Sequence, residues 1–129
     1  ADCQTKSMRI HGHPGEVRAE RFREYGADAE LLEKLIATTP STNEPLDERL
    51  PYVAGQALFA ARHEMARSVE DVLARRTRAL FLDAEAALAA APSVAALLAA
   101  ELGRDAKWQT DQLEQFRHVA DAYRPDAAC

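Results

Sequence analysis

Apolar residues recur along most of this chain at intervals of three and four positions, the spacing of one face of an α-helix. The apolar side of four successive stretches consists of Leu31, Leu32, Leu35 and Ile36; Leu58, Phe59, Met65 and Ala66; Val69, Val72, Leu73 and Leu80; and Val94, Leu97, Leu98 and Leu102. A fifth stretch carries Trp108, Phe116, Val119, Ala120 and Tyr123 along one side. Since no stretch alternates with a period of two for long, the pattern predicts an all-α, compact bundle of about five or six helices with an irregular N-terminal segment.

Acidic and hydroxyl side chains mark the expected starts of these helices. Asp28, Asp83 and Asp105 each precede an apolar stripe, where a carboxylate can accept a hydrogen bond from the first turn. Ser68 and Asp71 have the spacing of a capping box, in which each side chain accepts from the other residue's backbone N–H. A new helix is therefore expected to start at Ser68.

Glycine and proline mark the expected ends. Gly26 is expected to close one or two helical turns over residues 17–25, and Gly103 is expected to close the stretch that ends at Leu102. Residues 40–51 contain three prolines without periodicity and are predicted to be a loop. Pro92, within an Ala-rich run, is expected to kink that run or to start a new helix, because proline has no backbone N–H to donate.

The composition limits the class of protein. The 129 residues suffice for one domain, and the net charge of −5 argues against a general nucleic-acid binder. We expect no membrane-spanning segment, because no fully apolar run approaches the roughly 18 residues that a span needs. Cys3 and Cys129 lie near opposite ends of the chain, which is not a disulfide framework and suits a reducing compartment.

Candidate catalytic and metal-binding residues are few. His63 and Glu64 invite comparison with the zinc signature HExxH, but Arg67 occupies the place of its second histidine. His11 and His13 have no cysteine or carboxylate partner nearby, so a terminal segment or a strand against a neighbouring domain is favoured over a metal site. The residues themselves therefore indicate no catalytic, cofactor-binding or metal-binding position.

The most unusual segment is the arginine-rich stretch 62–78, RHEMARSVEDVLARRTR, in an otherwise acidic chain. On a helix, Asp71 lies one turn from both Arg67 and Arg75. Arg76 falls on the apolar stripe, so its stem is expected to pack on the core and its guanidinium to need an acceptor. A solvated face and an anion or nucleotide site are the alternatives. The residues predicted to form a structural or interface network are Glu64, Arg67, Asp71, Arg75 and Arg76.

The string RHEMARSVEDVLARRTRALFLDAEAA, followed by VAALLAAELG, resembles the C-terminal domain of FAD-dependent, quinone-linked glycerol-3-phosphate dehydrogenases. Shorter cues of that family are IHG at 10–12, YG-D at 25–28 and LPY at 50–52, so the resemblance covers about residues 8–123. One departure is the helix after LPY, where the family usually has an acid and this chain reads VAGQALFAA.

The resemblance implies a parent enzyme that oxidises glycerol 3-phosphate to dihydroxyacetone phosphate and passes electrons from FAD to quinone. The FAD and substrate sites belong to the N-terminal part of that family, so this chain alone is expected to bind no cofactor and to be inactive. The chain is then expected to consist of a lead-in from a catalytic region (1–16), the helical domain (17–124) and a tail (125–129).

The partner implied by the resemblance is the N-terminal FAD and substrate domain of the same chain, with a homo-oligomer left open. Nucleic acid is not expected as a partner, and membrane association is expected only through the parent enzyme. The expected location is cytoplasmic, with the parent enzyme peripheral on the inner face of the cell membrane. The alternative is a free-standing helical interaction module that binds an acidic partner through its arginine-rich face.

Overall fold

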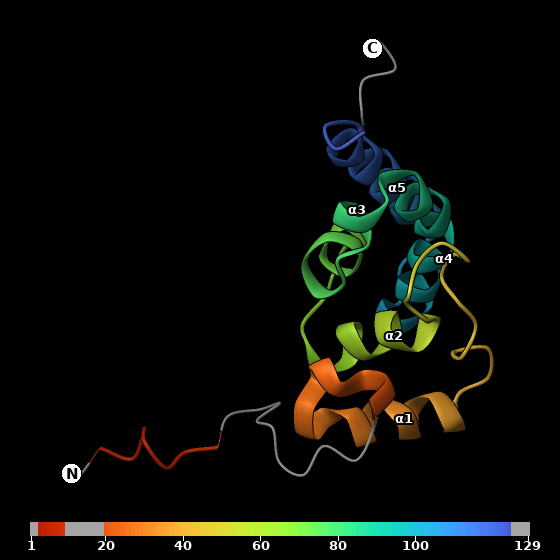
Figure 1. The fold of residues 1–129 in the computed structure, drawn as a ribbon. Coiled ribbons are helices and arrows are strands. Elements are labelled where there is room, and N and C mark those ends of the chain that lie inside the picture. Colours follow the sequence, from red (N-terminus) through yellow and green to blue (C-terminus); the bar gives the residue numbers. More distant parts are fainter. Residues whose placement is uncertain (1–2, 10–19, 125–129) are drawn as a thin grey trace. The chain divides into compact units, whose positions relative to one another are not determined.

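The computed structural model describes residues 3–9 and 20–124 (Figure 1). Its elements are η1 (Glu20–Asp28), α1 (Ala29–Thr38), α2 (Ala54–His63), η2 (Asp71–Arg76), α3 (Ala79–Leu82), α4 (Ala84–Leu102) and α5 (Ala106–Asp121). Helices account for every regular element among the described residues, apart from one isolated β-bridge between Pro45 and Val53. The prediction of an all-α fold is confirmed. The chain divides into two compact units, residues 1–39 and 40–129.

The first unit contains η1, a 3-10 helix, and α1. Gly26 has a φ of 56° and a ψ of −127°, a positive-φ conformation that glycine adopts readily, at a kink inside η1. Asp28 stands at the N-cap of α1, but its side chain makes no capping hydrogen bond there, so that part of the prediction is wrong. Of the predicted stripe, Leu32 is fully buried, whereas Leu31 is exposed. The helix ends at Thr38, whose hydroxyl donates to the Lys34 carbonyl oxygen.

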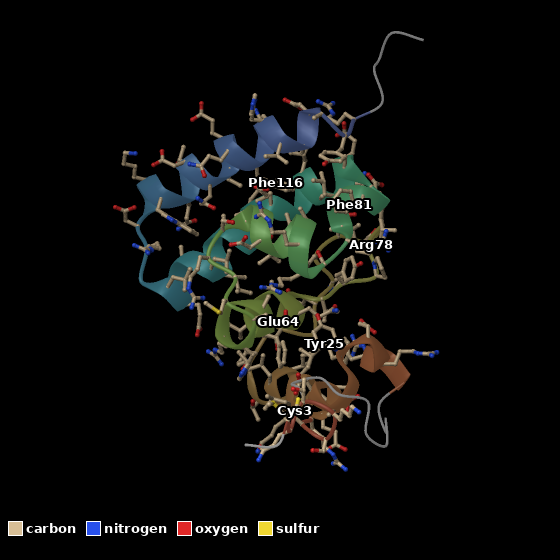
Figure 2. The ribbon with its side chains drawn as sticks, turned by 90° about the vertical axis from the view of Figure 1, so that its left-hand side faces the viewer. Cys3, Tyr25, Glu64, Arg78, Phe81 and Phe116 are labelled. Carbon is tan, nitrogen blue, oxygen red and sulfur yellow. The ribbon has the colours of Figure 1, made fainter. Side chains whose placement is uncertain are left out.

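The second unit is built around α4, which packs against α2, α3 and α5. Its buried residues are mostly alanines: Ala84, Ala86, Ala87, Ala90, Ala91, Val94, Ala95, Leu98 and Ala99. Small side chains let neighbouring helices approach closely, so one helix can contact several others. Phe116 of α5 is also buried, and Figure 2 shows it pointing from α5 toward the neighbouring helices.

The Ala-rich run forms one helix of 19 residues that continues through Pro92, so no new helix starts there. Its start and end follow the prediction. The Asp83 carboxylate accepts a hydrogen bond from the Ala86 N–H, and Gly103 closes the helix with a φ of 63°. In the next helix, the Asp105 carboxylate likewise accepts from the Trp108 N–H.

By length and composition, α4 is apolar enough to cross a membrane, contrary to the expectation that no stretch would be. Its only charged residues, Glu85 and Glu101, lie near its two ends. Helices at the centre of a packed core meet the same criteria, and nine of the residues of α4 are buried against its neighbours. This helix is the core of the second unit, and its high mean hydropathy follows from its alanines.

The apolar spacing between α2 and η2 does not produce one continuous helix. α2 ends at His63, and Met65 adopts a left-handed conformation with a φ of 60°. The Ala66 N–H then donates back to the Ala60 carbonyl oxygen. Met65, predicted on the apolar face, is instead 77% exposed because α2 has already ended there.

The chain becomes helical again after Ser68, as predicted, but residues Asp71–Arg76 form a π-helix. In this wider turn the Thr77 N–H donates to the Val72 carbonyl oxygen, five residues earlier. The buried face therefore passes from Val72 and Leu73 to Thr77. Arg76, predicted to pack on the core, is exposed because the wider turn rotates it off that face.

Candidate functional site

The arginine-rich stretch, defined here as residues Arg62–Arg78, runs from the end of α2 through η2 to the start of α3. Figure 2 labels Glu64 near its beginning and Arg78 at its end. Arg62, the first residue of the stretch, forms a bidentate ion pair with Glu101 near the end of α4. This pair raises the pKa of Arg62 and lowers that of Glu101. It joins the last turns of two helices that are distant in sequence.

Arg67 has a different role from the one predicted for it. Its guanidinium donates to the carbonyl oxygens of Ala61 and Ala66, both at 2.8 Å. The Ala61 carbonyl belongs to the last turn of α2, where carbonyls have no partner within the helix. The Arg67 side chain therefore supplies a hydrogen-bond donor to the unpaired carbonyl oxygen of Ala61 at the end of α2. Only the Arg67 backbone N–H donates to Asp71.

Asp71 is the acceptor at the centre of the stretch. One carboxylate oxygen, Oδ2, accepts from the backbone N–H groups of Arg67 (2.9 Å) and Ser68 (3.0 Å). The other, Oδ1, accepts from the Arg75 guanidinium at 2.7 Å. The Ser68 hydroxyl accepts from the Asp71 N–H, which completes the predicted capping box.

These contacts set the ionisation of Asp71. Partial burial of the carboxyl by itself raises its pKa, but hydrogen bonds from the Arg67 backbone, Ser68 and Arg75 outweigh burial and lower it. Arg75 also binds Glu70, with 2.6 Å between the guanidinium and carboxylate atoms. Of the predicted network, Asp71, Arg75 and the Arg67 backbone are thus in direct contact.

The other two members of the predicted network behave differently. Arg76 is exposed, and it forms no ion pair within the described ranges 3–9 and 20–124. Glu64 is half-buried at the end of α2, with its Oε2 atom buried. No ion pair between Glu64 and Arg67 is formed, since the Arg67 guanidinium contacts backbone carbonyls instead.

Three long-range contacts of this stretch could not be predicted from the sequence. These are the Arg62–Glu101 pair, the Val69 N–H donating to Gln112 of α5, and the Arg78 N–H donating to the Tyr52 hydroxyl. Each joins residues at least 26 positions apart. Periodicity reports only contacts within one helix, so none of these partners had a signal in the sequence beyond an available donor or acceptor.

The described residues contain no group of three or more histidine, cysteine or acidic side chains that could hold a metal ion. His11, His13 and Cys129 lie outside the described residues, and Cys3 is exposed. His63 packs its ring against Phe59, with 4.7 Å between ring centroids. The charges of Arg62, Arg67, Asp71 and Arg75 therefore bind other helices, helix-end carbonyls or backbone N–H groups within the domain.

The sequence of this chain is similar to a known domain family and to several longer proteins. The family model described as the C-terminal domain of alpha-glycerophosphate oxidase matches residues 2–109. The chain is 32% identical over 104 residues to the mitochondrial glycerol-3-phosphate dehydrogenase SDP6 of Arabidopsis thaliana, covering 78% of this chain and 16% of that protein. It is 30% identical over 111 residues to the mitochondrial glycerol-3-phosphate dehydrogenase of Homo sapiens, covering 83% of this chain and 15% of that protein.

A similar match is found in Dictyostelium discoideum, where the relative is named a probable mitochondrial glycerol-3-phosphate dehydrogenase. It is 29% identical over 102 residues, which cover 79% of this chain and 15% of that protein. The chain therefore spans only 15–16% of the length of these relatives. No solved structure matches the chain.

Proposed function

We propose that this chain, which belongs to the family of C-terminal domains of alpha-glycerophosphate oxidase, is the noncatalytic helical domain of an FAD-dependent glycerol-3-phosphate dehydrogenase. The observation that carries this proposal is the family match over residues 2–109. The matched relatives are glycerol-3-phosphate dehydrogenases several times longer than this chain. The flavin and substrate sites would then lie in the part of the parent protein that this chain does not span.

A structural role is supported by how the arginine-rich stretch uses its charges. Arg67 is committed to two backbone carbonyls, Arg62 to Glu101, and Arg75 to two carboxylates. A site for an anionic substrate needs cationic groups that are available to the ligand. In this proposal these three guanidinium groups therefore serve contacts within the domain instead of binding a ligand.

For the parent protein we propose oxidation of glycerol 3-phosphate to dihydroxyacetone phosphate, with electrons passing from FAD to quinone. FAD, when bound in the parent, supplies the redox chemistry. This chain contributes no residue to that step in the proposal. Its partner would be the N-terminal FAD and substrate domain, and the parent would be cytoplasmic and peripheral on the inner face of the cell membrane.

The test is an activity assay on the purified 129-residue chain with FAD, glycerol 3-phosphate and a dye acceptor. We expect no dye reduction above background, and no flavin retained by the chain after gel filtration. A Ser68→Ala, Asp71→Ala double variant serves as the control for contaminating activity. Dye reduction by the chain that disappears in this variant would overturn the proposal, whereas equal reduction in both samples identifies a contaminant.

A second candidate is an interaction module for an acidic partner. The observation that favours it is that Arg76, at the end of η2, and Arg78, just before α3, are both exposed. A fluorescent poly-glutamate peptide titrated into the chain tests it, with Arg76→Gln as the variant and Arg104→Gln as the control. Binding that weakens only in Arg76→Gln would support this function, and unchanged binding would exclude it.

A further inference from the structure

A surface hollow of about 580 Å³ lies between α4 and α5, away from the arginine-rich stretch. Its volume falls in the range of about 300–1,000 Å³ that is typical of small-molecule sites. It is lined by Arg49, Glu85, Leu88, Ala89, Ala91, Pro92, Leu113, Arg117, Asp121 and Arg124. The helices supply most of this lining, so the hollow is formed by elements whose positions the core fixes.

The apolar part of the lining comes from both helices. Leu88 and Leu113 are half-buried, so each presents part of its side chain to the hollow while the rest packs on the core. Pro92 adds an exposed ring in the middle of α4, where it has no backbone N–H to hydrate or to pair. Together these residues form a surface on which a short hydrocarbon chain can lose contact with water.

The charged part of the lining is net positive, with three arginines against two acids. Arg124 pairs with both of these acids, Glu85 and Asp121, so these three residues together carry a charge of −1. Arg49 is held by Asp47, which is not part of the lining. Arg49 also lies 4.0 Å from Asp83, so Arg117 is the one arginine of the lining that no acid pairs with among the described residues.

Arg117 differs from the other two arginines. It lies on α5, one turn after Leu113, and it is exposed. Across the described part of the chain it forms no ion pair or side-chain hydrogen bond. Its guanidinium can therefore bind a carboxylate or phosphate in bidentate geometry without first breaking an internal contact.

We propose that this hollow binds a small amphipathic anion, with a phosphate monoester or carboxylate head on Arg117 and a short apolar body on Leu88, Pro92 and Leu113. The pair of Arg124 with Glu85 and Asp121 forms the polar rim of the site. A negatively charged head group is favoured over a neutral or positive one, because the Arg117 guanidinium has no acid partner among the described residues. A head group without the apolar body would lack the contacts with Leu88, Pro92 and Leu113, and an apolar body without the head group would lack the ion pair with Arg117. Each alone is therefore expected to bind more weakly.

The test uses the 129-residue chain and octyl phosphate below its micelle concentration, followed by calorimetry and amide NMR. We expect saturable one-site binding, with chemical-shift changes centred on residues 85–92 and 113–117. Octan-1-ol and inorganic phosphate should each bind at least about tenfold more weakly. Vesicles containing phosphatidic acid distinguish a free ligand from a lipid head group, and they should not compete with octyl phosphate.

Two variants localise the binding. Arg117→Gln should weaken octyl phosphate at least about tenfold, because it removes the ion pair and keeps most of the stem. The matched control is Arg104→Gln, an exposed arginine after α4 that does not line the hollow, and it should leave binding unchanged. The proposal is overturned by absent or unsaturable binding, by equal binding of octan-1-ol, by competition from the vesicles, or by equal losses in the two variants.

Discussion

Arg62 and Glu101, separated by 39 positions in the chain, form a bidentate ion pair with donor–acceptor distances of 2.8 and 2.9 Å. The pair ties the last turn of α2 to the last turn of α4. Because both side chains are partly exposed, water and salt screen their attraction. The pair is therefore expected to fix the ends of the two helices more than to add a large amount of stability.

The first prediction follows from this geometry. Glu101→Gln should lower the free energy of unfolding by about 0.5–1 kcal/mol at low salt, the upper range for exposed pairs, and by less in high salt. Lys107→Gln is the matched control, since it removes an exposed pair with Asp111 within one helix. The measurement is the urea midpoint of each variant at two salt concentrations. A loss that does not decrease with salt would contradict the electrostatic origin.

Asp71→Ala should destabilise the chain by about 1–3 kcal/mol, because two backbone N–H groups and one guanidinium lose their acceptor. Asp71→Asn keeps a neutral acceptor for the backbone and should cost less. Glu70→Gln removes only the other contact of Arg75, so it serves as the control. Urea unfolding gives these values, and a midpoint unchanged in Asp71→Ala would mean that Asp71 does not hold this turn.

The lowered pKa of Asp71 also predicts a pH dependence. A group whose pKa is lower in the folded state stabilises it fully above the unfolded pKa, which is about 3.9 for Asp. This contribution is lost as the pH falls below about 4 and through the folded pKa. The wild-type chain should therefore lose more stability between pH 5 and pH 2 than Asp71→Asn does, in urea titrations at each pH. Parallel curves would contradict the prediction.

Substitutions at Met65 and Gly103 are expected to change the stability of the chain in opposite directions. Both have positive φ values, but Met65 carries a side chain that is 77% exposed. Met65→Gly should stabilise the chain by up to about 1 kcal/mol by removing the strain of a left-handed non-glycine residue.

Gly103→Ala should destabilise the chain by about 1 kcal/mol through the same strain. An added Cβ there meets nothing within 4 Å, so steric overlap does not contribute. Thermal unfolding of the two variants measures both effects. Changes of the same sign would refute the backbone explanation.

Arg76→Leu should leave the stability of the isolated chain within about 0.5 kcal/mol of wild type, because the side chain is exposed and forms no ion pair among the described residues. Arg67→Leu is the contrasting variant, since it removes both donors to backbone carbonyls, and it should be clearly destabilising. If Arg76→Leu also weakens the parent enzyme, this face contacts the remainder of that protein. Equal destabilisation of the isolated chain by both variants would contradict the assignment.

The local features of the fold could be predicted from the sequence. The capping box of Ser68 and Asp71, the caps at Asp83 and Asp105, and the left-handed Gly103 all depend on residues within a few positions of one another. Side-chain hydrogen bonds of this kind form as soon as the helix does, so short-range spacing predicts them.

The failures have a physical cause in two departures from regular helix. A period of 3.6 residues places Met65 and Arg76 on the apolar face, but a left-handed residue at Met65 and the wider turn of η2 change the phase. Neither departure involves a glycine or a proline, so the sequence carried no signal for them. The contacts of Arg62 and Val69 with other helices depend on the tertiary arrangement and could not be predicted from spacing.

The alanines that fill the buried side of α4 have a consequence for how this core responds to change. An alanine has no rotamers to lose on folding, so burying seven of them costs no side-chain entropy. For the same reason they have no alternative rotamers through which an added methyl group could be accommodated. A substitution such as Ala90→Val is then expected to shift the packed helices more than it would in a core of larger side chains. The interior of this domain is therefore expected to transmit small changes in volume directly into helix positions.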